Sequence, residues 1–210
     1  TKKQFDQWYD EFKKFILIKN IPSYHLDFYY SKEHCTSCCI HPEDPINGIH
    51  IINVNEMLLL AYGQNAKSIA YHEFTHIYDS AYFYKLFGKC KRENITLPYS
   101  EYHASQNQMM CAFNMKSIHD DKIVNMSDRV YDGLLTKRFT VQSYIKYINN
   151  DLTQTIDYYY STKCTVPIES RFIDILRHIT YYFGIVDVIS SRLENNSYIE
   201  NKYDYITGKI

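Results

Sequence analysis

The chain has 210 residues, of which 45% are apolar and 16% aromatic, and its formal net charge is −1. This length allows one sizeable domain but not two large ones, and the balanced charge argues against a broad nucleic-acid-binding surface, which needs a basic excess. No apolar run is long enough for a membrane span, and the N-terminal residues lack the apolar stretch of a signal peptide. We therefore expect a cytoplasmic protein that contacts neither a membrane nor nucleic acid directly.

A helix and a small sheet are predicted in the N-terminal part. Residues 3–18 carry apolar side chains at helical spacing. Residues 24–30 alternate between apolar and polar side chains, and residues 48–53 are rich in β-branched side chains, so both segments are predicted strands. Residues 31–47, between them, indicate a loop or an irregular hairpin.

Helices dominate the rest of the chain. Gly88 is a suitable C-terminal cap for the first of them, and Ser100 is a plausible N-cap for the second. The last is predicted to bend at Gly184. The predicted helices cover about residues 65–87, 100–118, 140–161 and 167–193. Early strands followed by helices indicate a helix-dominated α+β fold. We expect a single domain over residues 1–210, with the helix, sheet and site residues in 1–118 and a helical C-terminal part in 119–210.

The segment His72-Glu73-Phe74-Thr75-His76 falls within the helix predicted from about residue 65. Residues four apart on a helix share a face, so both imidazoles can bind one metal ion. Glu73, one step round the helix, can reach a water in an open metal position. A bound zinc polarises a carbonyl and acidifies its water, and the carboxylate acts as general base. The pattern therefore predicts one catalytic Zn²⁺ and hydrolysis of a peptide bond.

A third protein ligand has to come from elsewhere in the chain, because a catalytic zinc usually binds three side chains and water. No further histidine follows His76 at short spacing. Glu101, at the start of the next predicted helix, is the preferred candidate, and His103 in the same turn is its rival.

Other side chains near the motif are candidates for supporting roles. Asp79 lies on the ligand face and is a candidate acceptor for the second N–H of a ligand imidazole. Tyr99, Tyr102, His103 and His178 are candidate donors for stabilising a transition state.

HEFTHIYD, followed by a helix that begins Glu101-Tyr102-His103-Ala104, resembles the ImmA/IrrE family of zincin-like metallopeptidases. That family pairs an HExxH helix with a later E-x-x-A helix, and the resemblance covers about residues 48–118. It implies a zincin-like fold and a gluzincin-type site, with His72, His76 and Glu101 as ligands and Glu73 as base. After Ala104 the chain departs from the family pattern.

The resemblance also implies the kind of substrate: a protein such as a repressor, often in the setting of a mobile element or phage. An extended peptide is expected to add a strand beside residues 48–54.

A cluster of thiols and imidazoles between the predicted strands raises the question of a second metal site. Cys35, Cys38 and Cys39, flanked by His34 and His41, are suitable zinc ligands, although half of a structural site is missing. Candidates to complete it are Cys90, Cys111 and Cys164. The alternative is a loop with free thiols.

Two other functions stay open at this point. One is a non-catalytic zinc-binding protein of a mobile element, in which the site serves stability or partner binding. The other is a regulatory, DNA-associated module.

Overall fold

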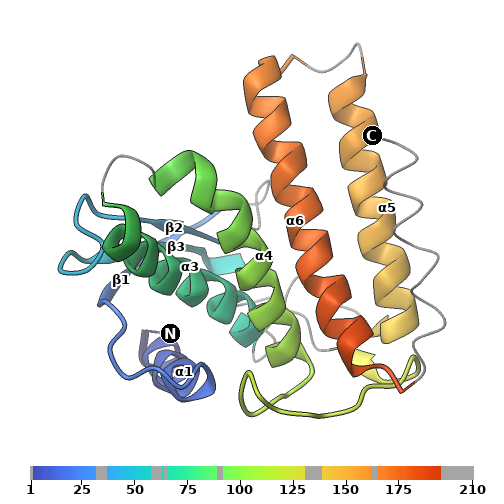
Figure 1. Ribbon diagram of the computed structural model, residues 1–210, viewed down its shortest axis with the longest axis horizontal. Coiled ribbons are helices and arrows are strands. Elements are labelled where there is room, and N and C mark those ends of the chain that lie inside the picture. Colours follow the sequence, from blue (N-terminus) through green and yellow to red (C-terminus); the bar gives the residue numbers. More distant parts are fainter. Residues whose placement is uncertain are drawn as a thin grey trace.

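A small sheet and a set of packed helices make up the molecule (Figure 1). The computed structural model describes residues 2–31, 37–57, 63, 66–88, 92–130, 139–161 and 165–194. Its elements are α1 (Lys2–Phe15), β1 (Tyr24–Tyr29), β2 (Ser37–Ile40), β3 (His50–Asn55), α3 (Ala66–Phe87), α4 (Arg92–Ala112), β4 (Arg129–Val130), β5 (Phe139–Thr140), α5 (Val141–Tyr160) and α6 (Ile168–Arg192). The predicted helix-dominated α+β class is therefore confirmed. Among the described residues, no helix is both long and apolar enough to cross a bilayer.

The sheet has three strands in the order β1-β3-β2, with β1 parallel and β2 antiparallel to β3. Leu26, Ile52 and Val54 are buried on one face, whereas Cys38 points to the exposed side. This alternation is what a sheet covered on a single face requires. Of the two alternatives predicted for residues 31–47, the hairpin is found at Ser37–Ile40, because β2 pairs antiparallel with β3. The predicted substrate position was wrong, because β3 is paired on both sides and leaves no edge for another strand.

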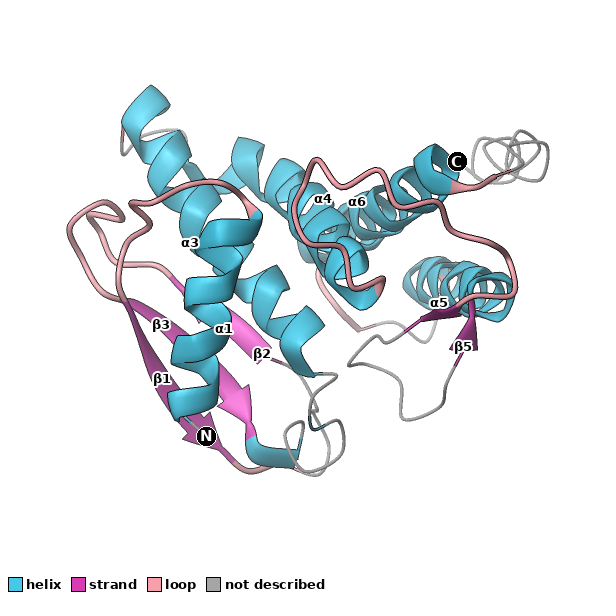
Figure 2. Cartoon of the chain, turned by 90° about the horizontal axis from the view of Figure 1, so that it is seen from below, coloured by secondary structure: helices cyan, strands magenta, loops and turns pink. Residues whose placement is uncertain are grey.

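Helix α1 lies against α3 (Figure 2), and aromatic side chains make the contact between them. Phe12 lies 5.1 Å from Tyr71 and 5.6 Å from Phe74 between ring centroids. Phe5 and Trp8 are also buried, so the helical spacing seen in the sequence marks the face that forms this core.

Helix α4 lies between α3 and α6, and α5 packs on the other side of α6 (Figures 1 and 2). Gly184 of α6 allows α6 to approach α4 closely. A Cβ added there would lie 1.9 Å from Ser105 Oγ and 2.3 Å from the Tyr102 carbonyl oxygen. The helix continues through Gly184 to Arg192. The glycine therefore serves helix packing, and α6 is not broken there.

Two helix starts show where the sequence prediction held and where it failed. Thr140 caps α5 with a capping box that includes Ser143, as the predicted start at residue 140 anticipates. Helix α4 instead begins at Arg92 and contains Pro98, so Ser100 is not its N-cap. A proline inside a helix removes one backbone hydrogen bond. Packing of α4 against α3 and α6 compensates for that loss.

Candidate metal centre

Helix α3 presents His72 and His76 on one face, one turn apart. The helix is unbroken from Ala66 to Phe87 and ends at Gly88, whose positive φ of 66° and bond to the Tyr84 carbonyl oxygen match a C-terminal cap. The two Nε2 atoms lie 3.0 Å apart. The Nε2 atoms of both imidazoles therefore point to one place.

Helix α4 brings Glu101 to that point. Its Oε2 lies 3.5 Å from His72 Nε2 and 3.9 Å from His76 Nε2. The other carboxylate oxygen, Oε1, accepts from Arg177 of α6 at Nε (3.0 Å) and Nη2 (2.8 Å). Arg177 thus fixes the carboxylate and leaves Oε2 turned to the histidines.

The separations between these atoms suit a zinc ion. Nitrogen and oxygen ligands about 2.0–2.2 Å from a tetrahedral ion lie about 3.3–3.6 Å from one another. The three observed separations, 3.0, 3.5 and 3.9 Å, bracket that range. Two imidazoles and one carboxylate are also the donor set of one class of catalytic zinc site, with the fourth position open to water. The residues present therefore fit the ion.

Ser100 orients the second histidine. Its Oγ lies 2.7 Å from Nδ1 of His76. When Nδ1 carries the proton and donates a hydrogen bond to Ser100 Oγ, Nε2 keeps its lone pair for a metal. This is the tautomer that coordination needs.

Asp79, predicted to orient a ligand imidazole directly, instead pairs with His103, at 2.9 Å between Oδ1 and Nδ1. His103 Nε2 lies 3.2 Å from the amide nitrogen of Asn107. Helix α4 places His103 opposite Asp79. His103 is held by these contacts, and Glu101 is the residue that lies with His72 and His76.

Glu73 lies on the side of α3 that faces the sheet. Its Oε1 accepts a hydrogen bond from Ser37 Oγ of β2 at 2.7 Å. Its Oε2 is buried and, among the described residues, has no hydrogen-bond partner. A buried carboxylate oxygen without a partner is costly unless a ligand or water meets it. Glu73 therefore has one oxygen that is held and one available for a proton.

Burial and charge set the protonation of these groups. Burial lowers the pKa of His72, but the hydrogen bond and charge of Glu101 outweigh it and raise that pKa above 6.5. Burial and the neighbouring His72 lower the pKa of His76 to about 3. Burial raises the pKa of Glu101, but His72, His76 and Arg177 together hold it well below its ordinary value. Burial raises the pKa of Glu73.

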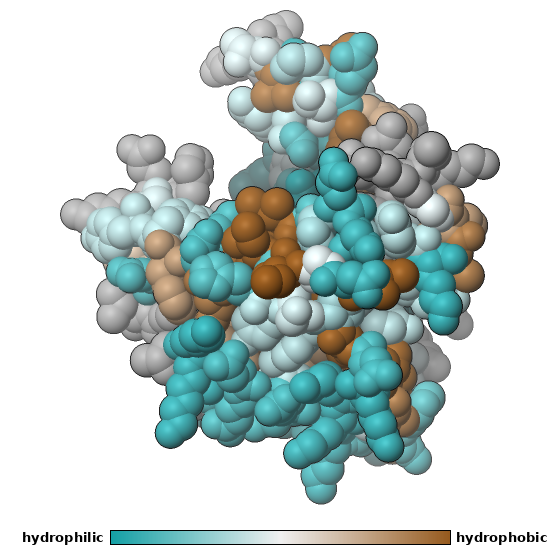
Figure 3. Space-filling view, turned by 90° about the vertical axis from the view of Figure 1, so that its left-hand side faces the viewer, coloured by the Kyte–Doolittle hydropathy of each residue, from teal (hydrophilic) through white to brown (hydrophobic). Residues whose placement is uncertain are grey.

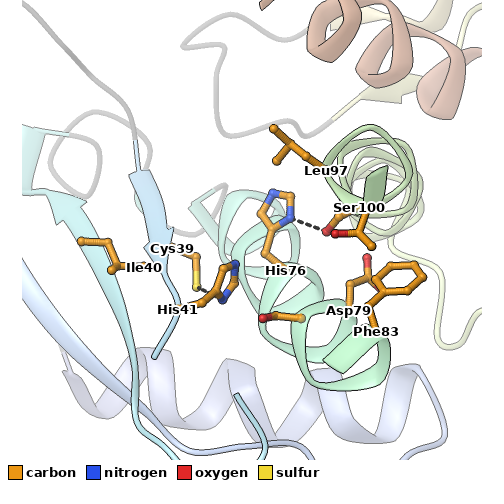
Figure 4. A pocket seen from close by; sticks show the side chains of 10 residues that line it. Cys39, Ile40, His41, His76, Asp79, Phe83, Leu97 and Ser100 are labelled. Atoms are coloured by element: carbon orange, nitrogen blue, oxygen red, sulfur yellow. Dashed lines mark hydrogen bonds between the residues drawn. The ribbon is translucent and has the colours of Figure 1, made fainter. Parts of the chain in front are cut away.

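A cavity of about 420 Å³ opens beside His76 (Figure 4). It lies between strand β2 on one side and helices α3 and α4 on the other. Its lining residues are Cys39, Ile40, His41, His76, Asp79, Ser80, Phe83, Thr96, Leu97 and Ser100. Glu73 does not line this cavity, and its carboxylate lies on the sheet side of α3, at Ser37 of β2.

The remaining candidate donors have other partners. Tyr102 donates its hydroxyl to Asp187 of α6 at 2.5 Å, and His178 Nδ1 lies 2.8 Å from the Asp174 carbonyl oxygen. Tyr99 is 52% exposed and contacts Phe83 and His103 with its ring. In contrast, the ring of Tyr181, which the sequence did not single out, lies 5.8 Å from that of His72.

The predicted thiol cluster is only partly described. His34, Cys35, Cys90 and Cys164 lie outside the described residues. Cys38 and Cys39 point to opposite faces of the sheet, so they do not share a site. Cys111 is buried in the core.

No family model, curated protein or solved structure matches this chain. The assignment of a function therefore depends on the residues and geometry described above.

Proposed function

We propose that this protein is a zinc-dependent peptidase whose metal is held by His72, His76 and Glu101. The observation that carries the proposal is the convergence of three donor atoms from α3 and α4 on one point. The resemblance of HEFTHIYD and Glu101-Tyr102-His103-Ala104 to the ImmA/IrrE metallopeptidases supports it.

The arrangement of this centre favours catalysis over a purely structural zinc site. Structural zinc sites are usually closed by four protein ligands, whereas catalytic sites keep one position open. The described residues supply three donors here. When bound, zinc supplies a Lewis acid for the substrate carbonyl and for an attacking water.

Glu73 would act as the general base. It would accept a proton from the attacking water on Oε2 and return it to the leaving amine nitrogen. Ser37 would hold Oε1 meanwhile, so that the carboxylate keeps its orientation through both transfers. The raised pKa of Glu73 makes it a better proton acceptor than an ordinary glutamate.

The substrate would lie along β2 rather than β3. Among the described strands, β2 pairs with β3 alone, and its Cys39 and Ile40 line the cavity beside His76. An extended peptide can add to such an edge through main-chain hydrogen bonds. Ile40, Phe83 and Leu97 provide apolar contacts for its side chains. Figure 3 shows apolar side chains gathered near the middle of one face of the molecule, with polar ones around them.

The test is the substitution Glu73→Gln, which keeps an acceptor for Ser37 but removes the base. A mixture of unstructured peptides is incubated with the zinc-loaded protein and analysed by mass spectrometry. We expect the wild-type protein to cleave peptides, and so should the control variant Glu11→Gln, whose substitution lies in the partly exposed helix α1. The variant Glu73→Gln should bind zinc without cleaving any peptide.

Equal cleavage by Glu73→Gln and wild type would exclude this mechanism. Zinc binding by the wild type without cleavage of any peptide would favour the alternative, a non-catalytic zinc-binding protein.

A further inference from the structure

A second group of metal-binding side chains lies on the hairpin formed by β2 and β3. Cys39, His41 and His50 each offer a ligand atom, and these atoms all lie within 4.8 Å of one another. The group shares no residue with His72, His76 and Glu101.

The register of the hairpin explains why these three meet. Ile40 pairs with Ile51, so His41 stands opposite His50 in the next position. Cys39 is two residues before His41, and side chains two apart in a strand point to the same face. All three therefore lie on the face that is covered by α3, and Cys38 lies on the other.

The ring of His50 is oriented for coordination. It is fully buried, and its Nε2 lies 2.9 Å from the Pro45 carbonyl oxygen. A carbonyl only accepts, so Nε2 carries the proton and Nδ1 has the lone pair in the neutral ring. A backbone carbonyl that fixes the tautomer in this way is the usual support for a metal-binding histidine.

The distances also suit a metal ion. His50 Nδ1 lies 2.9 Å from His41 Nδ1, and Cys39 Sγ lies 3.7 Å from the same His41 nitrogen. Around a tetrahedral zinc, two nitrogen ligands are about 3.3 Å apart, and a sulfur and a nitrogen are about 3.6 Å apart. Two nitrogens and a sulfur are donors that suit zinc better than calcium or magnesium.

We infer that Cys39, His41 and His50 form a second zinc-binding site, separate from the proposed peptidase centre. Cys39 and His41 line the same cavity of about 420 Å³ as His76, so a fourth ligand can reach this ion from the cavity (Figure 4). The ion would join the two strands at the wall where the substrate is proposed to lie. The site itself does not depend on the peptidase proposal.

Cobalt(II) provides a test that separates the two sites. A thiolate bound to cobalt gives a near-ultraviolet charge-transfer band, and the first centre contains no sulfur. We expect this band in the cobalt-loaded wild type and in the double variant His72→Ala/His76→Ala. It should disappear in Cys39→Ser, together with one equivalent of tightly bound metal per chain.

Two further variants complete the design. Cys38→Ser, on the opposite face of the same strand, should keep the band, and His41→Gln, at a partly exposed ring, should weaken cobalt binding at least tenfold. Circular dichroism checks that each variant is folded. Absence of the band in the wild type, or its persistence in Cys39→Ser, would overturn the inference. The band in His72→Ala/His76→Ala tests this site even if no peptidase activity is found.

Discussion

The substitution Ser100→Ala examines how the protein positions a metal ligand. It removes the hydroxyl that lies 2.7 Å from His76 Nδ1 and leaves a residue that favours helix. The His76 side chain is 11% exposed and Ser100 is 8% exposed, and both line the cavity, so any water that takes the place of the hydroxyl has to be ordered there. The imidazole N–H then loses its acceptor.

The size of the effect follows from two considerations. Leaving a buried donor unsatisfied costs about 1–3 kcal/mol, and loss of an outer contact to a metal ligand weakens metal affinity about 10–100-fold. The hydrogen bond between Ser100 and His76 also exists in the metal-free protein. Its loss therefore changes the zinc affinity only by the difference between its strength in the zinc-bound protein and in the metal-free protein. We therefore expect the lower end, about tenfold weaker zinc binding, which corresponds to about 1.4 kcal/mol.

Competition with a chromophoric chelator measures this affinity. Ser80→Ala is the matched control, since Ser80 lines the same cavity and its buried Oγ has no hydrogen-bond partner among the described residues. Zinc affinities of Ser100→Ala and wild type that agree within about twofold would refute the proposed role of Ser100. So would an equal loss in Ser80→Ala.

Two further predictions concern helix packing and pH. Gly184→Ala gains about 1 kcal/mol of helix propensity, but its Cβ would meet Ser105 and the Tyr102 backbone in a contact that costs about 2–3 kcal/mol, the upper part of the usual range for overpacking. We expect a net loss of about 1–2 kcal/mol and a melting temperature lower by about 2–8 °C, and an unchanged or higher value by calorimetry would contradict the packing argument. In the metal-free protein, only His72 has a raised pKa among the two ligand histidines, whereas His76 stays neutral down to about pH 3. Below the His72 pKa, zinc binding at the first centre should therefore weaken by about tenfold for each unit by which the pH falls. Chelator competition in the Cys39→Ser variant, which lacks the second site, measures this change. A hundredfold change per pH unit would show instead that two protons compete with the metal.

Local sequence patterns were sufficient to predict the part of the candidate centre that lies on α3. The spacing of His72 and His76 and the cap at Gly88 are properties of a single helix, so they could be read without knowledge of the fold. The same is true of the capping box at Thr140. Glu101 was proposed from its place at the start of the next predicted helix and from the resemblance to the ImmA/IrrE family, and its approach to α3 depends on tertiary packing.

Two contacts missed in the sequence depend on how the chain folds. Arg177 pairs with Glu101 across 76 positions, and nothing near either residue indicates the other. His50 meets His41 only because β2 exists, and that strand is too short to show a clear alternation. The predicted helix started at about residue 100, after Pro98, whereas α4 begins at Arg92 and contains that proline.

Zinc-edge anomalous scattering from crystals grown with Zn²⁺ would test the central claim most directly. The account predicts a strong peak bonded to Nε2 of His72, Nε2 of His76 and a carboxylate oxygen of Glu101, with Arg177 still on the other oxygen. Imidazoles that diverge, or zinc bound elsewhere in the crystal but absent from this point, would contradict it.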